Sequence, residues 1–221
     1  MNLGHRSSFH RYFRTLLLTG LLFSPLTLAA CQLFGYQEQI SGHPVDAQYK
    51  GLADKSVAIV IYADQATTNE FPAAREEMSA FLSTKLRESL STTKLLDYHE
   101  VMNWQDETIN WFGLTEKQIG KHFGVDRVLY IEVLDYSVNQ KGGAGDLQGH
   151  LRANCKVYET DTAGNDPAWS SVIDVSFPED HPVDPTQVPP DAVRARTLDK
   201  FSEQLVNCLY DHHEITHAIS E

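Results

Sequence analysis

The sequence predicts an α/β fold of the α+β kind, a single domain in which helices pack against a mixed β-sheet. In the first half of that domain, short apolar β-branched runs alternate with amphipathic helical patterns, which is typical of strands and helices that share one sheet. In the second half, two strand-like runs are separated by a turn. These two runs predict an antiparallel hairpin, which makes the sheet mixed.

The first strand is predicted at residues 57–62, a nearly continuous β-branched run that suits a strand buried on both faces. Pro72 is favoured in the first turn of a helix, and a helical pattern continues from it to about Leu90. The apolar residues of this pattern recur at three- and four-residue spacing, which predicts an amphipathic helix: Met78, Phe81, Leu82, Leu86 and Leu90. Residues 95–99 then suit a short strand.

A second helix is predicted where Thr115 and Gln118 have the spacing of a capping box. Gly124 is expected to end this helix as a C-cap residue. The apolar run over residues 125–134 follows it and predicts the second strong strand.

The glycines at 142–145 precede the predicted hairpin strands at 147–158 and 169–177. A phosphate-binding loop needs a lysine and a serine or threonine after its last glycine. Here Asp146 and Leu147 stand in those places, so the glycines predict a turn.

The C-terminal part of the domain begins with a Pro-rich connector over residues 178–190, which holds five prolines. This density excludes a helix or a central strand. A closing C-terminal helix is predicted over residues 191–212, with Asp191 favourably placed for the helix dipole. Its apolar face comprises Leu198, Phe201, Leu205, Cys208 and Leu209.

Residues 1–30 have the features of an export signal peptide: a basic start, a short apolar core and small residues at the end. The segment Leu28-Ala29-Ala30-Cys31 resembles the lipobox of bacterial lipoproteins. This resemblance implies cleavage before Cys31, a diacylglycerol on its thiol, and N-acylation, for example by palmitate. Two or more acyl chains hold a protein durably at a membrane. The alternative is a plain signal peptide with a cysteine nearby.

Gln32 follows the lipobox cysteine. In the sorting scheme of Gram-negative lipoproteins, an aspartate at that place favours retention in the inner membrane. The resemblance therefore implies a cell-envelope location, lipid-anchored at the outer membrane and facing the periplasm. Residues 31–54 are polar with scattered glycines and predict a flexible tether, and the domain is expected over residues 55–215.

Charge bears on the class of partner. The full chain has 18 basic and 30 acidic residues. Removing the signal peptide also removes Arg6, Arg11 and Arg14, so 191 residues remain with 15 basic and 30 acidic groups, a net charge of −15. Such a charge repels nucleic acid and anionic lipid surfaces. We therefore expect no nucleic-acid partner.

Once Cys31 is set aside, Cys155 and Cys208 form an even pair in an oxidising compartment. Both lie on predicted apolar faces. They are either two separate buried thiols, which act as small hydrophobic residues, or a disulfide. The sequence leaves both alternatives open.

Three large aromatic residues, Trp104, Trp111 and Phe112, stand in a polar stretch. They either cover one end of the core or form an exposed interaction surface, where aromatic residues are enriched. Core cover is the more conservative interpretation.

The sequence also bears on catalysis. No Gly-x-Ser-x-Gly elbow is present. His213-Glu214-Ile215-Thr216-His217 matches the zinc-protease pattern, in which His213 and His217 would share a helical face as ligands and Glu214 would act as base. The match stands at the polar end of the predicted last helix, so we expect a solvated helix end. The sequence predicts no catalytic residue, no metal and no cofactor.

A second resemblance covers residues 55–177. It is carried by the first strand, by the run Phe123-Gly124-Val125-Asp126-Arg127-Val128-Leu129, and by the hairpin residues 157–164 followed by Trp169. These features are similar to the amino-terminal domain of TolB, the LpoB activator of peptidoglycan synthases and the curli-secretion lipoprotein. The usual turn after the first strand is replaced by Ala63-Asp64-Gln65, and no membrane-inserting hairpin of the curli kind is present.

The resemblance implies a non-catalytic accessory protein or scaffold of bacterial envelope assembly or transport, which acts through contacts with unidentified envelope proteins. Two rival functions are a periplasmic metal-binding protein or enzyme that uses the C-terminal histidines, and an auxiliary lipoprotein of a lipid or solute transporter.

Overall fold

The computed structural model describes residues 42–139 and 145–214. Cys31, His217 and most of the glycine-rich turn lie outside the described residues. The chain divides into a compact unit, Asp46–Asp211, and a second unit formed by its two ends. Among the described helices, none has the length and apolar character that crossing a bilayer requires.

The compact unit is built on a five-stranded sheet with the strand order β3-β2-β4-β5-β6. β2 is parallel to both of its neighbours, β3 and β4. β4, β5 and β6 are antiparallel, so the predicted mixed sheet is confirmed. The strands are β2 (Ser56–Tyr62), β3 (Lys94–Leu95), β4 (Arg127–Asn139), β5 (Leu147–Glu159) and β6 (Trp169–Phe177).

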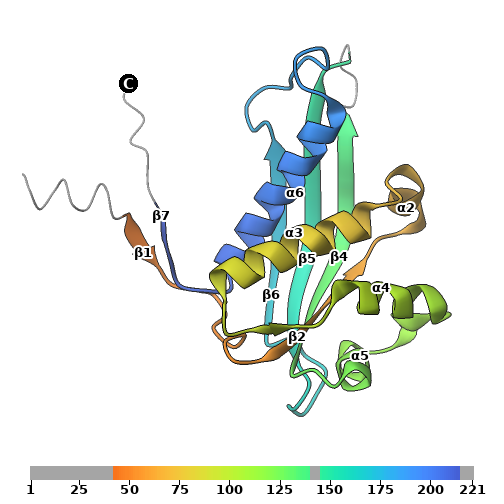
Figure 1. Cartoon of the computed structure of the whole chain (residues 1–221), viewed down its shortest axis with the longest axis vertical. Coiled ribbons are helices and arrows are strands. Elements are labelled where there is room, and N and C mark those ends of the chain that lie inside the picture. The colour runs from red at the N-terminus through yellow and green to blue at the C-terminus, as the bar shows by residue number, and fades with distance from the viewer. Residues whose placement is uncertain (1–41, 140–144, 215–221) are drawn as a thin grey trace, which may run out of the picture. The chain divides into compact units, whose positions relative to one another are not determined.

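Helices cover both faces of this sheet, which confirms the α+β fold. α3 and α6 lie across one face (Figure 1) and contribute to the larger apolar core. α4, the short 3-10 helix η1 and α5 belong to a second, smaller core on the other face. The helices are α2 (Gln65–Glu70), α3 (Ala74–Ser89), α4 (Tyr98–Glu107), η1 (Trp111–Gly113), α5 (Glu116–Phe123) and α6 (Pro190–Asn207).

The larger core explains which residues hold the unit together. Met78 of α3, Leu151 of β5 and Phe201 of α6 are fully buried in it. Truncating such a side chain to Ala typically costs about 2–5 kcal/mol. That is a large part of the roughly 5–15 kcal/mol that stabilises an ordinary domain.

Several local predictions are confirmed. α5 has a complete capping box between Thr115 and Gln118. Gly124 ends it in the left-handed conformation with φ 64°, which glycine adopts without steric cost. The predicted strands at 57–62, 147–158 and 169–177 correspond to β2, β5 and β6.

The segment after the first long helix differs from its prediction. The strand expected at 95–99 is limited to Lys94–Leu95, because α4 begins at Tyr98. The Asp97 side chain caps this helix by accepting a hydrogen bond from the His99 N–H. The polar stretch after β2 also forms a helix, α2, which Asp64 caps by accepting from Thr67 N–H.

The predicted tether, residues 31–54, is longer than the segment outside the compact unit. Residues 46–54 belong to that unit, where Leu52 is fully buried. The N–H groups of Gln48 and Tyr49 both donate to the Cys208 carbonyl, at 2.9 and 3.1 Å. These contacts give the segment a fixed place at the end of α6.

The C-terminal helix, predicted over 191–212, ends at Asn207. His212–Glu214 instead form β7, which pairs antiparallel with β1 (His43–Val45) in a two-stranded sheet. Pairing with a distant segment replaces the last helical turn of the prediction.

Candidate interaction surface

The segment that joins α4 to α5 exposes an unusual amount of apolar side chain. Five large hydrophobic residues stand exposed in the described parts of the chain, and three of them lie here. They are Ile109, Phe112 and Leu114, with exposed fractions of 88%, 59% and 39%. We call these three residues the apolar loop.

Backbone geometry explains why these side chains point outward. Asn110 adopts the left-handed conformation with φ 60°, which asparagine tolerates better than most residues. The N–H of Gly113 donates to the Asn110 carbonyl at 2.9 Å, and that of Leu114 donates to the Trp111 carbonyl at 3.0 Å. This tight turn buries Trp111 and leaves Phe112 in solvent.

An aromatic cluster on the core side of Trp111 supports the apolar loop. Trp111 meets Tyr62 edge to face, with ring centroids 6.1 Å apart, and lies 6.3 Å from Trp104. Trp104, which is half-buried, stacks on His122 and meets Phe123 edge to face, both at 5.1 Å. Such pairs contribute about 0.5–1.5 kcal/mol beyond their burial, so the loop rests on a packed base.

The three aromatic residues singled out in the sequence therefore divide between the two alternatives. Trp111, 8% exposed, belongs to the second core. Trp104 packs against that core, while Phe112 is exposed. Sequence analysis missed Ile109 and Leu114, because an apolar residue in a loop carries no periodic signal.

Acidic residues flank the apolar loop. Residues 98–116 contain Glu100, Asp106, Glu107 and Glu116 and no lysine or arginine. Asp106 pairs with Arg75 at 2.6 Å, while Glu107 is exposed. The local sequence thus combines an apolar tip with an excess of acidic residues, of which Asp106 is balanced by Arg75.

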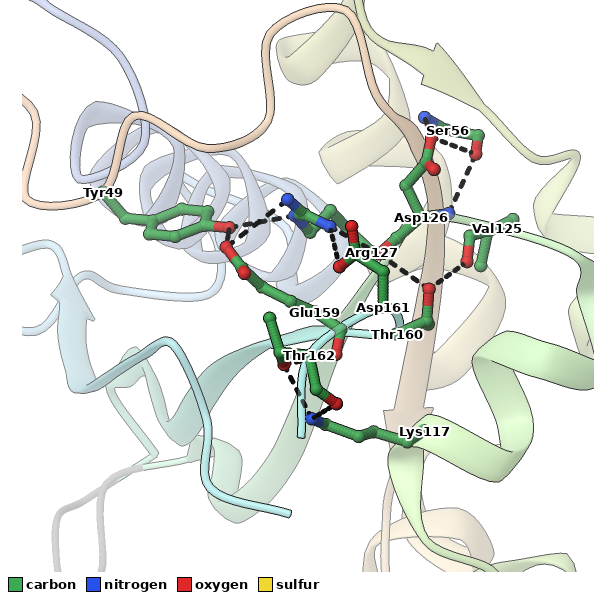
Figure 2. A network of polar contacts seen from close by, with 10 residues as sticks. All are labelled: Tyr49, Ser56, Lys117, Val125, Asp126, Arg127, Glu159, Thr160, Asp161 and Thr162. Carbon is green, nitrogen blue, oxygen red and sulfur yellow. Dashed lines mark hydrogen bonds and ion pairs between the residues drawn. The ribbon is translucent and has the colours of Figure 1, made fainter. Parts of the chain in front are cut away.

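A polar network lies at the end of the sheet where β4 begins and β5 ends (Figure 2). Its centre is Arg127, whose side chain is 7% exposed. The guanidinium donates to the Tyr49 hydroxyl at 3.1 Å and to Asp161 at 3.2 Å, and it lies 3.4 Å from Glu159. The Tyr49 hydroxyl in turn donates to Glu159 at 2.9 Å. Burial, together with this carboxylate acceptor, raises the pKa of Tyr49 to about 12.

The same network sets the register between β2 and β4. Asp126 accepts from the N–H and the hydroxyl of Ser56, at 2.9 and 2.8 Å. These two bonds hold the pKa of the Asp126 carboxyl below its usual value. Nearby, Lys117 donates to the carbonyl and hydroxyl oxygens of Thr162, at 3.0 and 2.8 Å.

The runs 123–129 and 157–164, distant in sequence, meet in this network (Figure 2). Arg127 is enclosed by protein partners, which suits a structural role. We therefore interpret the network as the part that fixes the fold.

Cys155 and Cys208 are free thiols in the structure, and both are buried in the larger core. Burial raises the pKa of both thiols, and for Cys155 the nearby Cys208 contributes to this rise. The Cys208 thiol donates to the Gln204 carbonyl at 3.4 Å. The structure brings the two cysteines into one cluster without a bridge, and the disulfide stays a prediction.

The zinc-like pattern at the C-terminus lacks the helix that it needs. His213 is an exposed residue of the strand β7, so the helical register expected for it is wrong. His217 lies outside the described residues. Within residues 42–139 and 145–214, no three histidine, cysteine, aspartate or glutamate side chains are placed to hold a metal ion.

No protein-family model matches this chain, and no curated protein matches it. Solved structures that resemble it include the lipoprotein GNA1162 from Neisseria meningitidis, with 15% identity, coverage of 69% of this chain and 98% of that one, and a TM-score of 0.42. A minor lipoprotein from Acinetobacter baumannii has 12% identity and a TM-score of 0.35, and the match covers 74% of this chain and 99% of that one. A Xanthomonas campestris protein has 10% identity and a TM-score of 0.45, and the match covers 75% of this chain and 90% of that one. None of these likenesses assigns a partner or an activity to this chain.

Proposed function

We propose that this chain is a lipid-anchored accessory protein of a bacterial envelope that acts without catalysis, by binding another envelope protein through its apolar loop. The observation that supports this function is the exposure of Phe112 and Ile109 on a packed aromatic base. The lipobox resemblance supplies the anchor, and the location at the outer membrane, facing the periplasm, belongs to the same proposal.

The chemistry of the apolar loop indicates what the partner offers. Ile109 and Phe112 would fill an apolar pocket, because their burial removes nonpolar surface from water at about 25 cal/mol per Å². The acidic residues around the loop favour basic side chains at the rim of that pocket. The excess of acidic residues in this stretch disfavours an anionic lipid surface, so a protein is the better partner.

The experiment compares substitutions at two exposed apolar residues, one in the apolar loop and one outside it. Phe112→Asp removes the tip of the apolar loop, whereas Leu134→Asp changes a residue of β4 that is similarly exposed, at 50%. Both variants are made in the full chain, and partners are captured from detergent-solubilised envelopes and quantified by mass spectrometry.

We expect a protein that wild type and Leu134→Asp capture equally and that Phe112→Asp fails to capture. An interface anchor contributes about 2 kcal/mol or more, so the Kd for that protein should rise roughly 30-fold. Equal capture by all three chains, with matching thermal melts, would contradict the proposed surface.

The absence of catalysis has its own test. The purified chain is assayed for hydrolase activity and for zinc content, beside the variant His213→Ala. Turnover that disappears in His213→Ala while the melting temperature is unchanged would replace the proposed function with an enzymatic one.

A further inference from the structure

β6 is an outer strand of the five-stranded sheet, next to β5 on one side only (Figure 1). It has nine residues, Trp169–Phe177, whereas β3 at the opposite edge has two. A long edge strand presents a row of unpaired N–H and C=O groups, which is a template for pairing with another strand.

The hydrogen-bond pattern shows which residues of β6 present these groups. Thr160 N–H donates to the Asp126 carbonyl at 3.0 Å. Bonding direction alternates along a strand, and the β4–β5 register is unshifted from Arg127↔Glu159 to Val133↔Ala153. In this part of β5 the even-numbered residues therefore bond to β4 and the odd-numbered ones bond to β6. The β5–β6 register runs without a shift from Val157↔Trp169 to Gly149↔Phe177. The backbone groups of the even-numbered β6 residues therefore face the open edge: Ser170, Val172, Asp174 and Ser176.

One of these outward groups already has a partner. Lys200 of α6 donates to the Ser176 carbonyl at 3.1 Å. This bond agrees with an outward direction for the even-numbered residues. It also marks Ser176 as the end of the usable edge.

β6 lacks the devices that normally protect an edge. Lysine, proline, bulges and inward charges discourage strand pairing, but Trp169–Phe177 contains no lysine or proline and no register shift. Its single charged residue is Asp174. That carboxylate lies 2.9 Å from His150 Nε2 and 3.7 Å from Arg152 Nε, both on β5. His150 holds the Asp174 carboxylate over the sheet, and the cation Arg152 partly offsets its charge.

We propose that β6 pairs antiparallel with β6 of a second copy of this chain, about a two-fold axis through Val172. In this register Val172, which is 49% exposed, lies opposite Val172 of the other copy, and Ser170 lies opposite Asp174. The first pair buries two exposed apolar side chains, and in the second a hydroxyl donates to a carboxylate. A shift of the axis by one residue, from Val172 to Ile173, sets Val172 against Asp174, which is unfavourable. The strand is thus self-complementary, as a two-fold interface requires.

The decisive variant is Val172→Cys in the full mature chain in its membrane, treated with a short bis-maleimide that joins two nearby thiols. The matched control is Leu134→Cys, which is equally exposed but lies on the inner strand β4. Wild type shows the background, because Cys155 and Cys208 are buried. We expect a cross-linked species of twice the chain mass from Val172→Cys alone.

A second measurement tests the pairing itself. Val172→Pro removes an outward N–H and leaves the β5–β6 hydrogen bonds in place. We expect wild type to have the mass of a dimer in detergent and Val172→Pro that of a monomer, with equal circular dichroism. If Val172→Pro unfolds, Val172→Lys gives the same comparison. A monomeric wild type at every concentration, equal cross-linking of the two cysteine variants, or a product with a different protein overturns the proposal.

Discussion

Arg127 donates a hydrogen bond to the Tyr49 hydroxyl over 3.1 Å, although the two residues are 78 positions apart in the chain. This bond joins the segment before the first long strand to the start of β4. Two acidic residues, Glu159 and Asp161, complete the shell around the guanidinium. The polar network thus ties three separate parts of the sequence together at one end of the sheet.

Arg127→Met should destabilise the domain by about 3–5 kcal/mol, because it leaves Glu159 partly buried without its cation. Urea unfolding measures the loss. The control is Arg196→Met, since Arg196 is 69% exposed and its pair with Asp199 spans 4.0 Å. That change should alter stability by no more than about 0.5 kcal/mol. Equal midpoints for the two variants would remove the structural role assigned to Arg127.

Stability should also depend on pH through Asp126. Its folded-state pKa is lowered by the hydrogen bonds from Ser56. A lowered carboxyl pKa contributes stability that is present above the unfolded value and is lost as pH falls through the folded value. Ser56→Ala removes the hydroxyl bond and should therefore lower the melting temperature at about pH 7 more than at about pH 3. A constant difference between wild type and Ser56→Ala across this range would contradict the assignment.

Local signals in the sequence predicted a large part of the fold. The capping box of Thr115 and Gln118 and the alternation of residues 147–157 depend on neighbours within a few positions, and the structure confirms both. Contacts between distant segments left no such signal. The burial of Leu52, the docking of Tyr49 near α6 and the pairing of His213 with Pro44 each depend on a partner far along the chain.

The candidate surface was predictable only in part, because the sequence shows residue types but not which side chains are buried. Trp104, Trp111 and Phe112 stand out by residue type alone, but their division between core and solvent depends on the left-handed turn at Asn110. The edge of β6 was not predictable, because strand order is a property of the whole sheet.

The lipid anchor gives a prediction about Cys31. Cys31→Ser should abolish labelling by a radioactive fatty acid and leave a species that is uncleaved or released from membranes, because the thiol that accepts the diacylglycerol is gone. Cys208→Ser, with its thiol in the folded core, serves as the control and should keep the label. Wild type without label would exclude the anchor.

The thiol count decides between the two alternatives for Cys155 and Cys208. The structure has both thiols free, while an oxidising compartment favours a bridge. A disulfide would add roughly 3–4 kcal/mol through the closed loop. If the bridge forms after export, alkylation of the denatured, non-reduced mature chain should label neither residue. Two labelled thiols would establish that the pair is a buried packing contact.

Adjacent residues should give opposite results in the apolar loop. Trp111→Ala removes a ring that is 8% exposed and packs on Tyr62 and Trp104, so it should cost about 3–5 kcal/mol of stability. Phe112→Ala removes a ring that is 59% exposed and should change stability by about 0.5 kcal/mol or less. Thermal melts of the two variants measure this contrast.

Partner capture should distinguish the same two variants in the opposite sense, because the variant that keeps its stability is the one expected to lose the partner. Phe112→Ala should lose the partner while its melting temperature stays near that of wild type, because the exposed ring is the proposed anchor. Trp111→Ala is informative only below its own melting temperature, where a folded chain with a loosened loop should bind more weakly than wild type. If Phe112→Ala binds as wild type does and melts at the same temperature, the apolar loop is not the interface.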